Sequence, residues 1–187
     1  MVQLFNSKIK ITIIVPVFNG ANSIVKAISS FLELSEFKGI DASLCIVDDC
    51  SEDGTLSMVQ DFVSTQRNIK LIRNRQNLGP GLSRNAALEQ ITDGYIGFLD
   101  ADDEIIPLSY FDSLRNGAAV NADWITFNGW IEQEGEFVQR YDFDRVVDDT
   151  NVLIRKCMRG ELDGSVIFSI YSAELIKSQR LRFPEGF

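Results

Sequence analysis

The sequence predicts an α/β fold with a mainly parallel central sheet. Short β-branched, apolar runs alternate along the first part of the chain with segments whose apolar residues have helical spacing. Consecutive strand–helix units of this kind build parallel sheets with right-handed crossovers. The 187 residues, of which 45% are hydrophobic, are enough for one such domain with a buried core.

The first strand–helix unit follows from the residue pattern. Residues 9–18 (IKITIIVPVF) are apolar and β-branched, which is typical of a buried strand in a parallel sheet. Asn19-Gly20 forms a turn, and residues 21–34 place apolar side chains on one face of a helix.

The same alternation continues along the chain. Further strands are expected at residues 42–47, 69–72 and 95–99. Further helices are expected at residues 55–65, 82–91 and 109–120. In such sheets ligands bind outside the carboxyl ends of the strands, so the residues that follow each strand are the candidates for chemistry.

The last third of the chain is less regular. Residues 124–131 and 136–142 alternate like strands, with Glu134-Gly135 as the turn between them. Residues 151–160 and 173–179 have helical spacing.

Composition excludes several classes of function. With a net charge of -9 and no Lys/Arg-rich stretch, the chain is not expected to bind nucleic acid. Without histidine it has no Ser-His-Asp triad and no histidine-ligated zinc, so acid–base and metal chemistry must rest on carboxylates. The longest strongly apolar run, residues 11–18, is far shorter than the ~20 residues of a membrane span. The odd number of cysteines, without paired spacing, fits a reducing compartment.

The first two strands end in residues that could hold a nucleoside. Phe18 could form the wall of a base pocket; the alternative is a turn with Phe18 in the core. In Asp48-Asp49, one carboxylate could accept an N–H of a base or reach a ribose hydroxyl. The alternative there is a capped turn with Ser51 and Asp53 as helix N-caps.

The third strand is followed by a glycine-rich turn and an arginine. Gly79 and Gly81 bring backbone amides close to a helix N-terminus, which favours an anion, and Arg84 adds a charged fork suited to phosphate or a base edge. The alternative is a Gly/Pro turn with Arg84 on the surface. The string matches G-x-G-x-x-G poorly, because Arg84 stands at the third glycine and the turn follows the third strand, so a dinucleotide-binding fold is not favoured.

The fourth strand ends in Asp100-Ala101-Asp102-Asp103-Glu104, four carboxylates within five residues. A hard divalent cation relieves their repulsion, and magnesium or manganese commonly shares such ligands with substrate phosphates. Asp100 and Asp102 can point to the same side of the strand end. The alternative is a solvated loop with Asp103 capping a short helix. Together the strand ends predict a site for a nucleoside diphosphate and a metal.

In this order the motifs resemble those of the family 2 glycosyltransferases. The matching strings are IVPVFN at 14–19, IVDDCSEDGT at 46–55, NLGPG at 77–81, SRN at 83–85 and FLDADD at 98–103. The resemblance implies the three-layer nucleotide-sugar-binding fold called the glycosyltransferase A-type fold. It also implies an inverting enzyme that transfers a sugar from a UDP- or GDP-linked donor, often with manganese or magnesium.

The resemblance further assigns roles to the nucleotide-binding residues. Pro16 and Phe18 would line the nucleoside pocket. Asp49 would bind the base, with Asp48 beside it. Arg84 would contact the nucleotide.

By the same resemblance Asp100 and Asp102 would form the Asp-x-Asp motif near the ribose, the diphosphate and the metal, and Asp102 would be the direct metal ligand. The family's general base comes from a Glu-Asp pair that is expected just beyond Phe187. We therefore expect a single domain truncated at its C-terminal end, with residues 1–104 as the nucleotide-binding half and 105–187 as the start of the acceptor-side half. Such a fragment would bind the donor but transfer little or nothing.

The resemblance places the chain in bacterial cell-surface polysaccharide synthesis, with a saccharide or lipid-linked saccharide acceptor. A cytoplasmic location at the inner membrane face would suit that role. A non-catalytic nucleotide-binding module stays open as an alternative. A metal-dependent phosphatase is disfavoured, because the nucleophilic aspartate of aspartyl-phosphate enzymes follows the first strand, where this chain has Phe18-Asn19.

Overall fold

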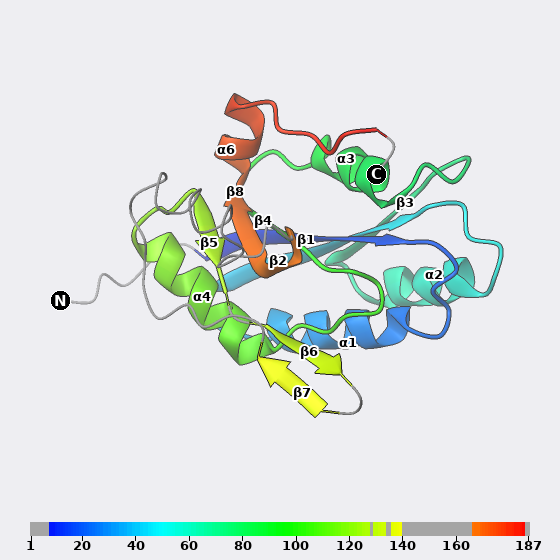
Figure 1. Ribbon diagram of the computed structural model, residues 1–187, viewed down its shortest axis with the longest axis horizontal. Helices are drawn as coiled ribbons and strands as arrows, with labels where there is room; N and C mark the ends of the chain where they lie inside the picture. The colour runs from blue at the N-terminus through cyan, green and yellow to red at the C-terminus, as the bar shows by residue number, and fades with distance from the viewer. Residues whose placement is uncertain (1–7, 128, 134–135, 140–165, 186–187) are drawn as a thin grey trace.

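The computed structural model describes residues 8–127, 129–133, 136–139 and 166–185, and these confirm the predicted α/β architecture. A six-stranded sheet lies between two layers of helices (Figure 1).

The central sheet has the strand order β3-β2-β1-β4-β8-β5. Its parallel strands are β1 (Ile9–Val17), β2 (Ile40–Asp48), β3 (Ile69–Arg73) and β4 (Tyr95–Phe98). Beyond β4 lie β8 (Ser169–Ser172) and β5 (Trp124–Thr126), and β8 is antiparallel to both of its neighbours. The sheet is therefore mainly parallel, as predicted, and the carboxyl ends of β1 to β4 share one edge.

Helices cover both faces of the sheet (Figure 1). The helices on one face are α1 (Ile24–Ser35), α2 (Thr55–Thr65) and α4 (Pro107–Ala119). Those on the other face are α3 (Pro80–Leu88) and the short α6 (Ala173–Ser178). The predicted strands and helices of the first 120 residues are confirmed, with ends that differ by a few residues.

The burial of β1 explains its uninterrupted apolar sequence. Ile13 and Val15 pack in the cluster that includes α1, whereas Ile14 packs in the cluster on the α3 side. All three are 1% exposed or less. A central parallel strand covered on both faces needs apolar residues at every position rather than at alternate ones.

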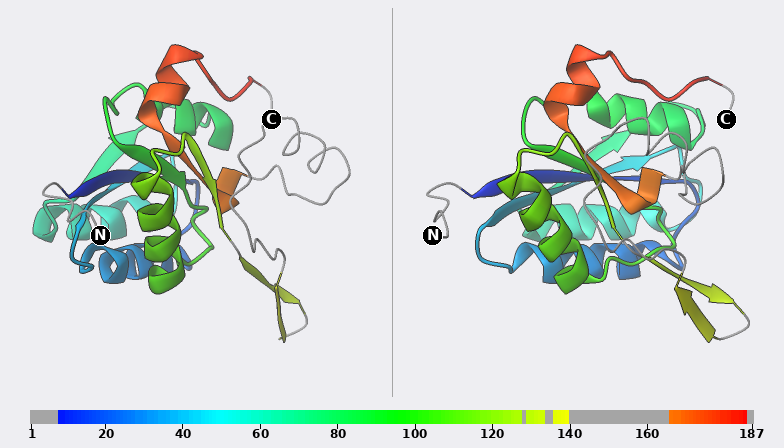
Figure 2. Two further views of the ribbon diagram at one scale, coloured as in Figure 1. Left: turned by 90° about the vertical axis from the view of Figure 1, so that its left-hand side faces the viewer. Right: turned by 60° about the vertical axis from the view of Figure 1, so that its left-hand side comes forward.

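The last third differs from the sequence prediction in its pairing. Residues 124–131 were expected to form one strand, but they divide between β5 in the main sheet and β6 (Trp130–Gln133). β6 pairs with β7 (Glu136–Gln139) in a separate hairpin that projects from the body (Figure 2). β5 instead pairs with β8, which follows the 3-10 turn η1 (Val166–Phe168) and was not predicted. Residues 140–142 and 151–160 lie outside the described residues.

Candidate functional site

The ends of the parallel strands bring most of the predicted site residues to one edge of the sheet. Val17, Asp48 and Arg73 lie side by side in register at the ends of β1, β2 and β3. Phe18 and Asp49 follow the first two of these strands, and Asp100 comes shortly after β4. This is the edge at which parallel α/β sheets bind ligands.

The loops after β1 and β2 are joined by side-chain hydrogen bonds. The Asn19 N–H donates to Ser51 Oγ at 2.9 Å, and the Glu52 N–H donates to Asn19 Oδ1 at 2.9 Å. The Ala21 N–H donates to Asp53 Oδ2 at 3.1 Å. Asn19 has a φ of 52°, a left-handed conformation that asparagine tolerates better than most residues. These contacts fix the backbone that follows Phe18.

These hydrogen bonds between the two loops are found in place of the alternative prediction, a turn in which Ser51 and Asp53 cap the next helix. The N-cap of α2 is Gly54, and it makes no side-chain capping bond. Ser51 is buried and bonds to Asn19, so the expectation that it caps the helix is wrong. Asp53 lies one residue before the N-cap and accepts bonds from the N–H and the hydroxyl of Thr55, which lower the pKa of its carboxyl.

The two residues expected to line a nucleoside pocket differ in exposure. The Phe18 side chain is 48% exposed, so it is not the core residue of the alternative interpretation, and it offers an open aromatic face. Pro16 is buried and lies beside Val47 in the sheet. Pro16 is therefore a buried residue of the β1 end, whereas Phe18 is the open aromatic residue.

Asp49 is buried and ties the β2 end to the loop before α3. It is 3% exposed. Its Oδ1 accepts bonds from Asn74 Nδ2 at 2.7 Å and the Leu78 N–H at 2.9 Å. Its Oδ2 accepts from the Gly79 N–H at 2.8 Å and, more weakly, from Leu78 at 3.1 Å. The anion held by this glycine turn is thus Asp49 itself, and the Leu78 and Gly79 amides that could have faced a phosphate are already engaged.

Asp48 lies deeper than Asp49 and faces other partners. It is 0% exposed, and its Oδ1 accepts the Ser51 N–H at 3.3 Å. Its Oδ2 lies 3.4 Å from Arg73 Nε. The adjacent carboxylates therefore separate, one toward Arg73 and one toward the α3 loop, which limits their mutual repulsion.

Arg84 connects α3 with the end of β4. Its Nη2 lies 2.5 Å from Asp100 Oδ1, and its side chain is 12% exposed. The alternative of a surface cation is therefore wrong. Sequence reasoning gave Asn85 no role and did not foresee that Phe183 lies against Arg84, with its ring centroid 5.4 Å from the guanidinium carbon. The string SRN contained Asn85, but no local pattern named its partner.

The acidic residues after β4 form a tight turn beside the loop after β1. The Asp103 N–H donates to the Asp100 carbonyl at 3.1 Å. A Cβ added at Gly20 would lie 3.8 Å from Ala101 Cβ, so the two loops are neighbours. Loss of solvent, and then the charges of Asp100 and Asp102, raise the pKa of the Asp103 carboxyl. Asp103 does not cap α4, whose N-cap is Ile106.

The carboxylates of this turn suit a cation that also binds a substrate. Among the described residues, no three His, Cys, Asp or Glu side chains form a ready metal cage. Asp102 and Asp103 are exposed, and Asp100 is partly engaged by Arg84. Magnesium and manganese often bind through one or two carboxylates together with substrate phosphates, and this donor set fits that pattern.

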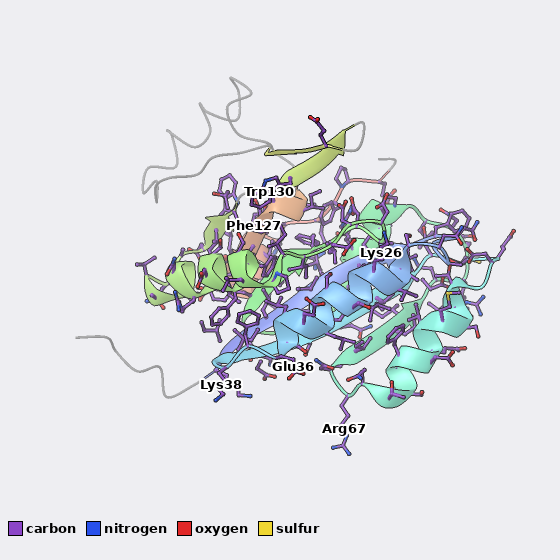
Figure 3. The ribbon with its side chains drawn as sticks, turned by 90° about the horizontal axis from the view of Figure 1, so that it is seen from below. Lys26, Glu36, Lys38, Arg67, Phe127 and Trp130 are labelled. Atoms are coloured by element: carbon purple, nitrogen blue, oxygen red, sulfur yellow. The ribbon has the colours of Figure 1, made fainter. Side chains whose placement is uncertain are left out.

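One hollow lies away from this edge. It has a volume of about 770 Å³, lies between the C-terminal ends of α1 and α2, and is lined in part by Glu36 and Arg67, which Figure 3 labels. No predicted site residue lines it. Within the described residues, no helix is both long and apolar enough to cross a membrane.

A family model and several known proteins resemble this chain. The model described as Glycosyl transferase family 2 matches residues 12–157. The chain is 28% identical over 179 residues to GalNAc(5)-diNAcBac-PP-undecaprenol beta-1,3-glucosyltransferase of Campylobacter jejuni, covering 95% of this chain and 56% of that protein. It is 29% identical to succinoglycan biosynthesis protein ExoO of Rhizobium meliloti, covering 94% of this chain and 51% of that protein.

Solved structures give the same likeness. A crystal structure of TarS residues 1–349 from S. aureus matches with a TM-score of 0.78 and 27% identity, covering 95% of this chain and 51% of that chain. The same protein in complex with UDP-GlcNAc matches with a TM-score of 0.77. The chain thus spans about half the length of these relatives. The likeness confirms the expected three-layer fold class.

Proposed function

The chain belongs to glycosyl transferase family 2, and we propose that it transfers a sugar from a nucleotide-diphosphate sugar to an acceptor hydroxyl, with inversion at the anomeric carbon. The observation that carries this proposal is the strand-end site. There the exposed Phe18 and the Arg84–Asp100 pair stand beside a turn with further carboxylates. The TarS relative was solved with UDP-GlcNAc and with UDP, which supports a nucleotide-sugar donor for this site.

We assign the donor's parts to the residues as follows. The base lies against the ring of Phe18, above Pro16 and near Asp49 and Asp48. Each Asp49 oxygen already accepts two N–H bonds, and the 3.1 Å bond from Leu78 to Oδ2 is the longest of the four. Asp49 therefore shapes the pocket mainly through the Leu78–Gly79 loop and would accept a base N–H only in place of that longest bond. Residues 1–104 supply this nucleotide-binding half.

The diphosphate is assigned to the space between α3 and the acidic turn. The Arg84 guanidinium lies there and can donate an N–H bond to a phosphate oxygen. Asp102 and Asp100 would hold magnesium or manganese. When bound, the metal would neutralise charge that builds on the leaving diphosphate. The acceptor hydroxyl would give its proton to a carboxylate outside the described residues.

The names of the relatives suggest the setting. One acts on an undecaprenol-linked saccharide, and another takes part in succinoglycan biosynthesis. We propose a saccharide or lipid-linked saccharide as the acceptor, bacterial cell-surface polysaccharide synthesis as the pathway class, and the cytoplasmic face of the inner membrane as the location.

Calorimetric titration of the chain with UDP, GDP and their sugars, with and without manganese, tests the donor site. We expect one of the two nucleotides to bind, and to bind more tightly with manganese. A matched titration with inorganic phosphate and manganese separates nucleotide recognition from simple anion binding. If neither nucleotide binds in either condition, the assignment of this edge as a donor site is wrong.

The cysteines provide a second test of the site's location. Cys50 directly follows Asp49 and is partly exposed, whereas Cys45 is buried, which raises the pKa of its thiol to about 11. At pH 8 roughly 0.1% of Cys45 is therefore thiolate. We expect iodoacetamide to alkylate Cys50 quickly and Cys45 only on unfolding, and we expect the bound nucleotide to slow the reaction at Cys50.

Mass spectrometry of the peptides resolves each cysteine, including Cys157, which lies outside the described residues. Cys45 reacting as fast as Cys50 would contradict the burial of β2. Unchanged Cys50 reactivity at saturating nucleotide would place the ligand elsewhere.

A further inference from the structure

The segment around Phe183 docks on α3 through a pair of hydrogen bonds between the Asn85 side chain and the Phe183 backbone. Asn85 Nδ2 donates to the Phe183 carbonyl at 2.9 Å, and the Phe183 N–H donates to Asn85 Oδ1 at 3.0 Å. The side-chain amide of Asn85 thus pairs with both the N–H and the carbonyl of one residue, as a residue of a neighbouring strand would. The two residues are 98 positions apart, so this contact fixes the segment to the first part of the chain.

The Phe183 ring completes the contact by covering a charged side chain. Its centroid lies 5.4 Å from Arg84 Cζ, within the range of a cation–π contact. The same ring meets Phe98 edge-on at 5.4 Å. Arg84 is held on another side by Asp100, and its Nε is buried without a hydrogen-bond partner among the described residues. The guanidinium is therefore enclosed between an aromatic ring and a carboxylate.

We propose that Phe183, held in place by Asn85, positions Arg84 for the diphosphate of the donor. This inference rests on the proposed function and adds two positioning residues to its site. A long arginine side chain loses rotamer freedom when it binds a ligand, and this loss weakens affinity. The ring and the carboxylate remove that freedom before the nucleotide arrives. The segment around Phe183 is accordingly part of the donor site.

The chain offers a matched control for this contact. On the other face of the sheet, the Phe111 ring lies 5.6 Å from Arg115 Cζ and also contacts a second phenylalanine, Phe37, at 4.8 Å. Phe111→Leu and Phe183→Leu therefore remove the same kinds of contact, one far from the site and one inside it. Phe183→Tyr keeps the ring and should behave as the unchanged chain.

Nucleotide titration with these variants gives the first readout. We expect Phe183→Leu to weaken nucleotide binding about fivefold to tenfold, and Phe111→Leu to leave it unchanged even where both lower the melting temperature. In an Arg84→Ala background, Phe183→Leu should have no further effect. Equal affinities for Phe183→Leu and the unchanged chain, or equal losses for both leucine variants, would overturn the proposal.

A second readout does not depend on the nucleotide. In ¹H–¹⁵N spectra of the arginine side chains, the Arg84 Nε–H should exchange slowly with water, and Arg84→Lys identifies its signal. Phe183→Leu should shift this signal and speed its exchange, whereas Phe111→Leu should not. If the unchanged chain binds no nucleotide but the signal behaves in this way, the donor assignment is wrong, while the positioning of Arg84 by Phe183 is supported. Fast exchange of the Arg84 Nε–H in the unchanged chain would overturn the positioning of Arg84 by Phe183.

Discussion

Asp102→Asn is expected to remove the metal-dependent part of nucleotide binding and to weaken affinity in manganese on the order of 100-fold. Asp100 already has one oxygen engaged by Arg84, whereas Asp102 is exposed in the adjoining turn. A divalent cation that shares phosphate ligands needs a carboxylate that is open to solvent before the donor arrives. The measurement is calorimetric titration with and without manganese.

Glu104→Gln is the matched control for this prediction. It removes the same charge from the same exposed loop, two residues further on, so any general effect of net charge on an anionic ligand appears in both variants. Without manganese the two variants should bind alike. If manganese still strengthens nucleotide binding by the full factor in Asp102→Asn, Asp102 is not the metal ligand, and Asp100 or Asp103 would be the ligand instead.

Asp102→Asn should also change the free energy of unfolding in a pH-dependent way. Loss of solvent and the charges of Asp100 and Asp102 raise the pKa of Asp103, so the folded state holds its proton more tightly than the unfolded chain. Ionisation of Asp103 therefore lowers the free energy of unfolding at pH values above the raised pKa. This loss of stability shrinks as the pH falls through the raised pKa and is gone below the ordinary carboxyl pKa. Asp102→Asn removes part of the repulsion. We expect it to stabilise the metal-free chain slightly at pH 7, and not at a pH below the ordinary carboxyl pKa.

The first 120 residues could be predicted well because their information is local. An apolar run such as that of β1, buried on both faces, is visible without knowledge of its neighbours, and so is the helical spacing of α2. The strand ends then indicate a candidate site, because parallel topology brings them to one edge. Phe18 and the acidic turn were predicted in this way, and the structure places both after strands that end at this edge.

Contacts between distant segments could not be found from local pattern. β8 has the sequence Ser-Ile-Tyr-Ser, which carries no strong strand signal, and it becomes a strand by pairing with β4 and β5. Ser51 is a residue type that commonly caps helices and precedes α2, yet its Oγ instead accepts a hydrogen bond from the N–H of Asn19, 32 positions earlier. The Asn85–Phe183 pair leaves no periodicity at all. In each case a long-range partner decided the role of a residue whose neighbours suggested another.

The second large effect is expected at Asp49, where Asp49→Ala should lower the free energy of unfolding by about 3 to 5 kcal/mol. The carboxylate is 3% exposed and accepts bonds from Asn74, Leu78 and Gly79. Its removal leaves the Leu78 and Gly79 N–H groups without their acceptor in a part-buried loop, while Asn74 keeps only its bond to Ser83 Oγ. Urea unfolding followed by circular dichroism measures the loss.

Asp53→Ala is the control for the Asp49 prediction. Asp53 also accepts backbone N–H groups, from Ala21 and Thr55, but it is exposed, so water can replace its bonds. Its loss should be clearly smaller. An Asp49→Ala variant no less stable than Asp53→Ala would mean that the α3 loop is held by other contacts.

Asp49→Asn separates the structural role of this residue from contact with a base. If Asp49 accepts an N–H of the base, Asn should weaken UDP or GDP binding and leave ribose 5-phosphate, which has no base, unaffected. If Asp49 acts only by ordering the Leu78–Gly79 loop, the variant should weaken both ligands by the same factor, because the loop shapes the whole pocket wall. The engagement of both Asp49 oxygens favours the second result, because a base N–H could bind only in place of the longest of these bonds.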